Sequence, residues 1–336
     1  MKVVELAGGP GIKNLRLGER PMAAPDVGEV QVRLKAASLN YRDLLAVQGL
    51  YSKKMPLPLI PLSDGAGEVT RIGAGVTRFK PGDRVTVNFL QGWIGGAPSQ
   101  EKFATSLGGT ADGVLSEYRC FSQDGLVPTP DYLSDEEAAA LPCAALTAWS
   151  AIITQGGTGP GDRVLVQGTG GVSLFALQFA KLAGAEVIAT SSSPAKLERV
   201  KALGADHLID YRATPDWGKA ARALTGGRGL DHIVEVGGAG TLNQSIRAIR
   251  IGGIISMIGV LSGPSHELLI PLVVMQNIRL QGVTVGSRED FEAMLRAMAL
   301  HRIRPPIDRV FAMDEIQAAF EHMAAGRHFG KIIVRI

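Results

Sequence analysis

The residues whose types and spacing most directly suggest chemistry are Gly168, Gly170 and Gly171. They follow a short apolar run at 164–166, and they precede apolar residues that recur every three or four positions. Strand, glycine turn and helix form the unit that binds a dinucleotide pyrophosphate, because glycines let the backbone approach the phosphates and the N–H groups of the helix point at them. Ser173 replaces the third glycine of the Gly-x-Gly-x-x-Gly pattern, so the turn alone is a weak signal.

The end of the next expected strand, at 186–190, bears on which cofactor would bind. Folds that prefer NAD place an Asp or Glu there, which accepts from the ribose hydroxyls. This chain has Ser191 and Ser192 instead, with Lys196 close behind and no acid. Hydroxyl and ammonium donors suit a 2′-phosphate, so the sequence predicts NADP(H) rather than NAD(H). The alternative is that a serine only caps the following helix and Lys196 is a solvated surface residue.

Regular alternation of strands and helices surrounds this turn. Strands are expected at 163–167, 186–190, 207–210, 231–236, 253–259 and 279–285, and helices at 171–183, 194–203, 215–225 and 240–250. Such alternation implies right-handed crossovers and a doubly wound parallel sheet with helices on both faces. The fold class is therefore α/β, with a Rossmann-type sheet.

The part of the chain before this alternation is rich in strand patterns. Residues 1–125 contain alternating runs at 30–36, 65–75 and 80–87, separated by Pro/Gly turns and one short helix at 41–48. The loop expected at 91–113 carries Trp93, as a substrate wall or as a packed anchor. Ser134 and Glu137 form a capping box that begins a helix, and a second helix is expected at 144–154.

The pattern changes again after residue 287. A helix at 288–300, a strand at 308–311, a helix at 314–324 capped by Asp314 and a final strand at 332–336 are expected. We predict three segments: 1–125 as the first part of a catalytic domain, 126–287 as the dinucleotide-binding domain, and 288–336 as a return that completes the first domain.

Bulk composition fits a soluble globular enzyme. Of the 336 residues, 46% are hydrophobic and 20% charged, and the net charge of +3 is too balanced for a nucleic-acid or membrane-surface protein. The apolar runs are too short to span a bilayer, and no signal peptide is recognised. Cys120 and Cys143 are too few for a disulfide framework, so a reducing cytoplasm is expected.

The whole chain resembles the medium-chain dehydrogenase/reductase superfamily. The resemblance rests on motifs in order along the chain: Asn40-Tyr-Arg-Asp43, Gly65-Ala-Gly-Glu-Val, Lys80-Pro-Gly-Asp-Arg-Val, Leu141-Pro-Cys-Ala-Ala-Leu-Thr-Ala-Trp149, Gly168-Thr-Gly-Gly-Val, Ala202-Leu-Gly-Ala-Asp-His207 and Gly330-Lys-Ile-Ile-Val. It implies a GroES-like β-rich domain and a Rossmann domain, with the active site in the cleft between them. Within the superfamily, the chain is most similar to the zinc-independent quinone oxidoreductase and zeta-crystallin branch.

The comparison with zinc alcohol dehydrogenases bears on the metal. Those enzymes have Cys-His-x-Asp near position 40 and Gly-His-Glu near position 63, where this chain has Asn40 and Ser63 in place of the two ligands. Cys143 falls at the third ligand position, but one thiolate with Asp64 nearby does not make a catalytic site of three ligands plus water. Residues 91–119 contain no cysteine, so the structural zinc loop is also missing. We therefore expect no metal.

Without zinc to polarise an alcohol or carbonyl oxygen, the chemistry should suit quinones or alkenes conjugated to a carbonyl. Asn40 can hydrogen-bond a substrate carbonyl or the nicotinamide ribose. Tyr51 matches a tyrosine implicated in proton donation in related enoyl reductases, or it is a packed aromatic at the rim of the cleft. Asp64, Trp93 and Cys143 complete the expected substrate pocket.

The resemblance and the glycine turn together predict the cofactor contacts. These are Thr147, Gly168, Thr169, Gly170, Gly171, Val172, Ser191, Ser192, Lys196, Tyr211, Gly237, Gly259, Val260, Leu261, Ser287 and Lys331. The family also implies a homodimer. Two rival functions stay open: an NADP-dependent alcohol dehydrogenase or carbonyl reductase, and a non-enzymatic NADPH-binding structural or sensor protein.

Overall fold

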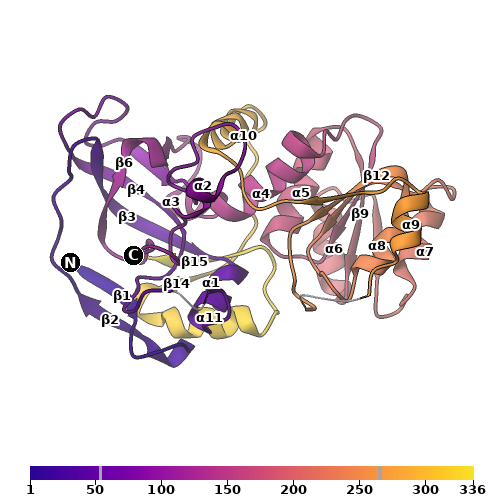
Figure 1. The fold of residues 1–336 in the computed structure, drawn as a ribbon, viewed down its shortest axis with the longest axis horizontal. Helices are drawn as coiled ribbons and strands as arrows, with labels where there is room; N and C mark the ends of the chain where they lie inside the picture. The colour runs from indigo at the N-terminus through magenta and orange to yellow at the C-terminus, as the bar shows by residue number, and fades with distance from the viewer. Residues whose placement is uncertain (53–54, 264–266) are drawn as a thin grey trace. The chain divides into compact units, whose positions relative to one another are not determined.

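The computed structural model describes residues 1–52, 55–263 and 267–336 (Figure 1). Its internal contacts divide the chain into two units, one of residues 1–146 with 285–336 and the other of residues 147–284. The return of the tail to the first unit was predicted from the sequence. Among the described residues, no helix is long and apolar enough to cross a membrane.

The first unit is built on a seven-stranded sheet. Its order is β14-β15-β3-β4-β5-β7, with β6 paired to β3. The strands of this unit are β1 (Lys2–Leu6), β2 (Leu15–Glu19), β3 (Glu29–Leu39), β4 (Asp64–Ile72), β5 (Arg84–Val87), β6 (Tyr118–Ser122), β7 (Leu126–Pro128), β14 (Ile307–Ala312) and β15 (Lys331–Arg335). Alternating side chains of β3, such as Val32 and Leu34, enter a core that is fully shielded from water.

The register of three strands positions the polar residues of this unit. Ser38 on β3 lies opposite Asp64 on β4, and Leu39 lies opposite Ile332 on β15. The end of β3 and the starts of β4 and β15 therefore meet. This register brings Asn40, Asp64 and Lys331 together from segments far apart in the sequence.

The helices of the first unit are mostly short. They are α1 (Tyr41–Val47), α2 (Gln100–Phe103), α3 (Asp135–Ala139), α10 (Arg288–His301) and α11 (Ile316–Ala324). Ser134 and Glu137 form the predicted capping box of α3, which packs on β3 and β4. Beyond α3 the helical path continues through two π-helical segments, Leu141–Ala145 and Ser150–Gln155, on either side of α4 (Leu146–Trp149).

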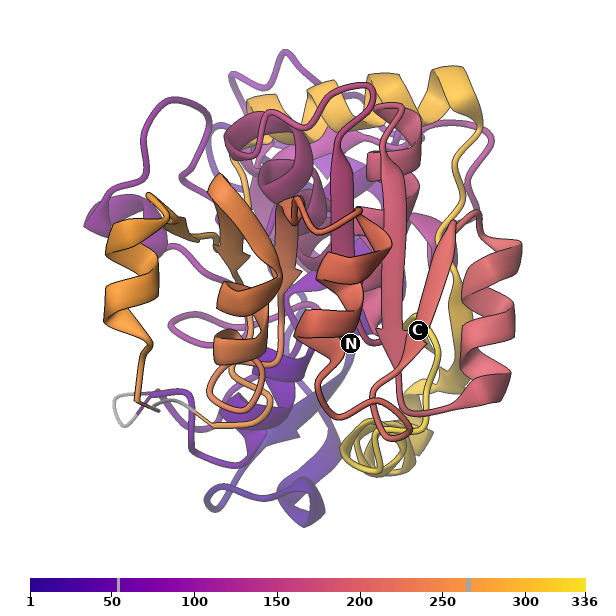
Figure 2. The ribbon, with the colours of Figure 1, turned by 90° about the vertical axis from the view of Figure 1, so that its right-hand side faces the viewer.

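The second unit contains a six-stranded sheet in the order β10-β9-β8-β11-β12-β13, and all of its strand pairs are parallel (Figure 2). Its elements are β8 (Arg163–Gln167), α5 (Gly171–Leu182), β9 (Glu186–Ser191), α6 (Pro194–Ala202), β10 (His207–Asp210), α7 (Trp217–Leu224), β11 (Leu230–Glu235), α8 (Leu242–Ala248), β12 (Ile249–Met257), α9 (Ile270–Met275) and β13 (Arg279–Gly282). The six predicted strands and their parallel arrangement are confirmed, with shifts of up to four residues at their ends.

Three sequence-based expectations need correction. The boundary at residue 126 is wrong, because β7 pairs with β5 and α3 packs on β3 and β4, which places residues 126–146 in the first unit. The segment 91–113 is not all loop, since Ser99 caps α2. Asp314 does not cap α11; it lies inside a 3-10 turn, and the helix begins after Glu315.

Candidate functional site

The glycine turn in the second unit has the geometry that a pyrophosphate requires. Gly168 has a φ of +71°, which disfavours any residue with a Cβ. A Cβ placed on Gly168 or Gly170 would meet no atom within 4 Å, so open space lies before this backbone. Gly170 is the N-cap of α5 and offers no side chain to the first N–H groups of the helix. The turn therefore fits an anionic group at the helix N-terminus.

Ser173 explains how the third glycine of the pattern is replaced. Its hydroxyl donates to the Gln167 carbonyl at 2.6 Å, and the side chain is buried. The serine therefore ties the first turn of α5 back to the end of β8. It occupies a packed position and leaves the space before Gly168 and Gly170 open.

The end of β9 has the polar residues expected for the adenosine side of the cofactor. Ser193 caps α6 by accepting from the Lys196 amide, which is the capping role considered from the sequence. Ser192 and Lys196 are partly exposed beside that cap, and Tyr211 donates its amide to the Ser191 carbonyl. Asp210 lies opposite Ser191 on the neighbouring strand β10. Its carboxylate accepts from the backbone N–H groups of the turn that follows it.

A buried carboxylate organises the next two loops, and the sequence analysis missed it. Glu235 ends β11 with no exposed surface. One of its oxygens accepts from the Gly237 and Gly238 amides, each at 3.0 Å, and from Thr241 Oγ1 at 2.5 Å. The other accepts from Gln167 Nε2 at 2.6 Å and Ser245 Oγ at 2.5 Å. An acid that directly follows the apolar pair Ile233 and Val234 at the end of the strand was the signal that could have found it.

The loops after β11 and β12 pack closely upon one another. A Cβ at Gly259 would come within 2.2 Å of the Val236 carbonyl, and one at Gly238 within 2.9 Å of Val260. Ser262 Oγ, in the loop after β12, joins the two loops by donating to the Gly237 carbonyl in the loop after β11. Val260 and Leu261 are about half exposed, so they are open to a ligand.

Two other predicted cofactor residues have structural partners. Thr147 donates its hydroxyl to the Thr284 carbonyl at 2.6 Å within the second unit. Ser287, in the first unit, is the N-cap of α10 and exchanges hydrogen bonds with Asp290. Their cofactor contacts stay predictions.

The first unit holds a closed ring of polar side chains at the meeting point of β3, β4 and β15. Lys331 Nζ donates to Asn40 Oδ1 at 2.5 Å and lies 3.9 Å from Asp64 Oδ2. Ser63 Oγ donates to Asp64 Oδ1 at 2.7 Å and lies 3.5 Å from Asn40 Nδ2. Asn40 is 8% exposed and the other three are at most 3% exposed, so all four are buried and Asn40 is the least buried of them. We call these four residues the buried polar ring.

A second group of charges leads from this ring to Tyr51. Asp43 Oδ2 accepts from the backbone N–H of Asn40, and Asp43 Oδ1 pairs with Arg42 Nη1 at 3.1 Å. Burial raises the pKa of Asp43 to about 6. The Arg42 guanidinium lies 4.5 Å from the centre of the Tyr51 ring. Tyr51 is 44% exposed, so its phenol is accessible while its ring rests on a fixed cation.

Trp93 and Cys143 belong to one small apolar cluster. Trp93 packs with Phe89 and Val285 and donates its indole N–H to the Gly96 carbonyl at 2.9 Å. These are the contacts of a loop anchor. Cys143 packs against the same cluster, and its amide donates to Asp64 Oδ2. Burial and the Asp64 carboxylate raise the pKa of the Cys143 thiol, so the sulfur stays protonated at neutral pH.

Two family models match the chain: an alcohol dehydrogenase GroES-like domain at residues 26–131 and a zinc-binding dehydrogenase at residues 171–299. A zinc-type alcohol dehydrogenase-like protein of Schizosaccharomyces pombe is 44% identical over 92% of this chain and 91% of its own. The chain belongs to the medium-chain dehydrogenase/reductase superfamily.

Other members of the superfamily cover the chain along its full length. The solved structure of an NAD-dependent alcohol dehydrogenase is 36% identical and covers 100% of both chains with a TM-score of 0.93. A chloroplastic quinone oxidoreductase of Triphysaria versicolor is 31% identical over 99% of this chain and 98% of its own. This medium-chain dehydrogenase/reductase is therefore an oxidoreductase with a GroES-like domain and a Rossmann sheet.

The zinc implied by one family model does not fit the residues of this oxidoreductase. A catalytic zinc needs three N, S or O ligands with a free position for water. The ring offers an amide and a hydroxyl, Cys143 is the one thiol beside it, and the Lys331 ammonium already lies beside Asp64. No group of three His, Cys, Asp or Glu side chains suited to a metal occurs within residues 1–52, 55–263 and 267–336.

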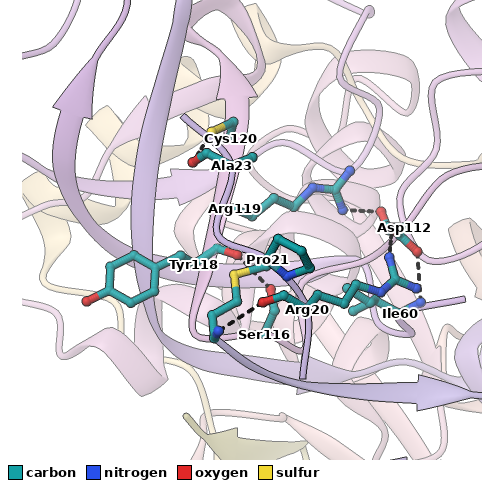
Figure 3. A pocket seen from close by; sticks show the side chains of 10 residues that line it. Arg20, Pro21, Ala23, Ile60, Asp112, Ser116, Tyr118, Arg119 and Cys120 are labelled. Atoms are coloured by element: carbon teal, nitrogen blue, oxygen red, sulfur yellow. Dashed lines mark hydrogen bonds and ion pairs between the residues drawn. The ribbon is translucent and has the colours of Figure 1, made fainter. Parts of the chain in front are cut away.

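A separate cavity of about 290 Å³ lies in the first unit (Figure 3). Arg20 pairs there with Glu5 and Asp112 at 2.5 and 2.6 Å, and Arg119 donates to the carbonyls of Asp112 and Gly113. Burial lowers the pKa of Arg119 to about 10. The charged side chains of this cavity tie the 112–113 turn to the sheet, and none of the predicted site residues lines it.

Proposed function

We propose that this oxidoreductase is an NADPH-dependent, zinc-independent reductase of quinones or α,β-unsaturated carbonyls. The observation that carries the proposal is the buried polar ring, in which Asn40 and Ser63 stand at the expected ligand positions and the Lys331 ammonium lies beside them. The open glycine turn at Gly168, in the second unit, supports a dinucleotide cofactor. Its chloroplastic relative is a quinone oxidoreductase by name.

The chain's own residues supply orientation and hydrogen bonding. NADPH, when bound, supplies the hydride. Asn40, the least buried member of the ring, donates a side-chain amide N–H to the acceptor's carbonyl oxygen and holds the acceptor. Tyr51 presents an accessible phenol that can deliver the proton that the reduced acceptor needs. Quinones and enones need only this much assistance, because their conjugation spreads the developing negative charge onto oxygen.

The preference for NADPH rests on the acid-free end of β9. Ser192 and Lys196 can donate to a 2′-phosphate. We expect Lys196→Ala to weaken NADPH binding about tenfold, the loss of one charge-assisted hydrogen bond, and to leave NADH binding unchanged. Lys201→Ala, at an exposed position on the same helix, is the matched control. Fluorescence titration measures both cofactors, and equal affinity of the wild type for NADH and NADPH would contradict the preference.

The reaction is tested by NADPH oxidation against a panel of quinones, enones, aldehydes and simple alcohols, with metal content measured on the same sample. We expect turnover of a quinone or an enone in metal-free protein. Stoichiometric zinc, with activity lost on chelation, would overturn the proposal. NADPH binding without oxidation across the whole panel would favour a non-enzymatic role.

A second candidate function is an NADP-dependent alcohol dehydrogenase or carbonyl reductase. It is favoured by the names of the Schizosaccharomyces pombe relative and of the solved structure that is 36% identical. Alcohol oxidation or aldehyde reduction without quinone or enone turnover would establish it.

We also propose a cytoplasmic homodimer formed through the second unit. β13 ends the six-stranded sheet, and nearby Val274 and Met275 on α9 are 68% and 78% exposed. A sheet edge offers unpaired backbone groups, and the exposed apolar side chains on α9 would be covered by a partner. Cys120 and Cys143 are free thiols, which agrees with a reducing compartment. Light scattering after size exclusion tests the dimer, and a monomer at micromolar concentration would exclude it.

A further inference from the structure

Lys331 has a position that a cofactor contact alone does not explain. Its ammonium is 3% exposed and makes its hydrogen bonds within the first unit, to the Leu39 carbonyl at 2.8 Å and to Asn40 Oδ1 at 2.5 Å. A buried ammonium is unfavourable unless it is paired and hydrogen-bonded, and here Asp64 supplies the opposite charge at 3.9 Å. The arrangement therefore places the Lys331 ammonium beside the side-chain amide of Asn40.

The partners of Asn40 determine which way its amide faces. An ammonium can only donate, so the Asn40 atom beside Lys331 must be the oxygen. Ser63 gives its hydroxyl proton to Asp64, so it can only accept from Asn40 Nδ2. Both neighbours thus require the same orientation, with the oxygen toward Lys331 and the NH₂ group away from it.

This orientation has a chemical consequence. The contact from Nδ2 to Ser63 is long, at 3.5 Å, and an NH₂ group carries a second hydrogen. The adjacent positive charge draws electron density from the amide and makes its N–H a stronger donor. Asn40 is thus prepared to donate to an oxygen that gains negative charge, as a reduced carbonyl does.

We propose that Lys331 is a positioning residue that fixes the Asn40 carboxamide as a hydrogen-bond donor to the carbonyl oxygen of the substrate. Lys331 is then a cation built into the chain where related enzymes use a metal. The inference rests on the proposed reductase function. It assigns the Asn40 side chain as a hydrogen-bond donor to the substrate. The alternative, in which the same side chain accepts a hydrogen bond from the nicotinamide ribose, is set aside. Lys331 acts through Asn40 and need not touch either ligand.

The kinetic test compares Lys331→Met, Asn40→Ala and the double variant on the best quinone or enone. We expect kcat to fall about tenfold to a hundredfold in each single variant, with the NADPH dissociation constant unchanged within about twofold. The double variant should be no slower than Asn40→Ala, because the two residues act as one unit. Losses that multiply would overturn the inference, and so would a Lys331→Met variant that loses NADPH affinity but keeps its kcat.

Two further measurements keep the test independent of folding and of activity. Lys331→Met leaves the Asp64 charge unpaired, so Lys331→Met/Asp64→Asn removes both charges and is expected to stay folded and slow. The ¹⁵N–¹H signals of the Asn40 side-chain amide, assigned by their loss in Asn40→Ala, should shift in Lys331→Met. An unmoved signal refutes the inference even if the reductase function holds. A shifted signal in a protein that reduces nothing in the panel supports the contact and refutes only the function.

Discussion

Replacing Glu235 with Gln tests whether one buried carboxylate holds the loops of the dinucleotide-binding unit. Glu235 accepts five hydrogen bonds and has no exposed surface. Gln keeps the shape but turns one oxygen into an NH₂ group, which cannot accept.

The size of the effect follows from which donors lose their acceptor. If the NH₂ group takes the place of the first oxygen, it faces the Gly237 and Gly238 amides, which cannot turn away. If it takes the place of the second, it faces Gln167 Nε2, whose own oxygen is held by the Val236 and Gly237 amides. The first orientation strands two buried amide donors and the second strands one, because the Ser245 hydroxyl can turn and accept from the NH₂ group. The second orientation costs less, at about 1–3 kcal/mol for its one donor, so we expect a loss of about 2 kcal/mol and a fall of about 5 °C in the melting temperature.

The assay is thermal and urea unfolding followed by the fluorescence of Trp149 and Trp217, both in the second unit, together with NADPH titration. Glu198→Gln on the exposed face of α6 removes the same charge and is expected to change stability by less than about 0.5 kcal/mol. NADPH affinity should fall in the Glu235 variant, because its loop glycines lose their anchor. If both variants unfold at the same midpoint with equal NADPH affinity, the reasoning fails.

Two buried titrating groups predict opposite pH effects in the same range. His232 bridges Thr158 and Ser256, and burial lowers its pKa to about 4. The folded protein therefore favours the neutral imidazole. Stability should be lost as the pH falls from about 6.5 to 4, by about 3 kcal/mol. His232→Gln should flatten that loss when unfolding of the second unit is followed by tryptophan fluorescence. Burial raises the pKa of Asp43, so the protonated form is favoured in the fold and stability should fall as pH rises from about 4 to 6, by about 3 kcal/mol. Asp43→Asn should therefore gain on the wild type across that range in calorimetry, and a constant difference between the two would contradict the pKa.

Much of the second unit could be predicted from the sequence, because its signals are local. Each parallel strand is an apolar run followed by a turn and an amphipathic helix, so all six strands were found. The boundary at residue 126 was missed because β7 has only three residues and is held by its pairing with β5, a contact that no local pattern encodes. The four-residue α2 was missed for a similar reason.

The candidate site divides in the same way. The glycine turn could be predicted, since it depends on residue identity at known spacings, whereas the absence of zinc at Asn40 and Ser63 stays a prediction. The ring could not be predicted, because Lys331 and Asn40 are 291 residues apart and meet only through the register of β15 on β3. The role of Glu235 likewise depends on loops that fold back on its carboxylate.

The raised thiol pKa values have a consequence for self-protection. Quinones and enones are soft electrophiles that alkylate thiolates, so an enzyme that turns them over is exposed to covalent damage by its own substrates. This chain has two cysteines, and burial raises the pKa of both Cys120 and Cys143. Each therefore stays in the unreactive protonated form at neutral pH. The same burial that encloses Cys143 beside Asp64 thus favours the form of the thiol that reacts slowly with the compounds proposed as acceptors.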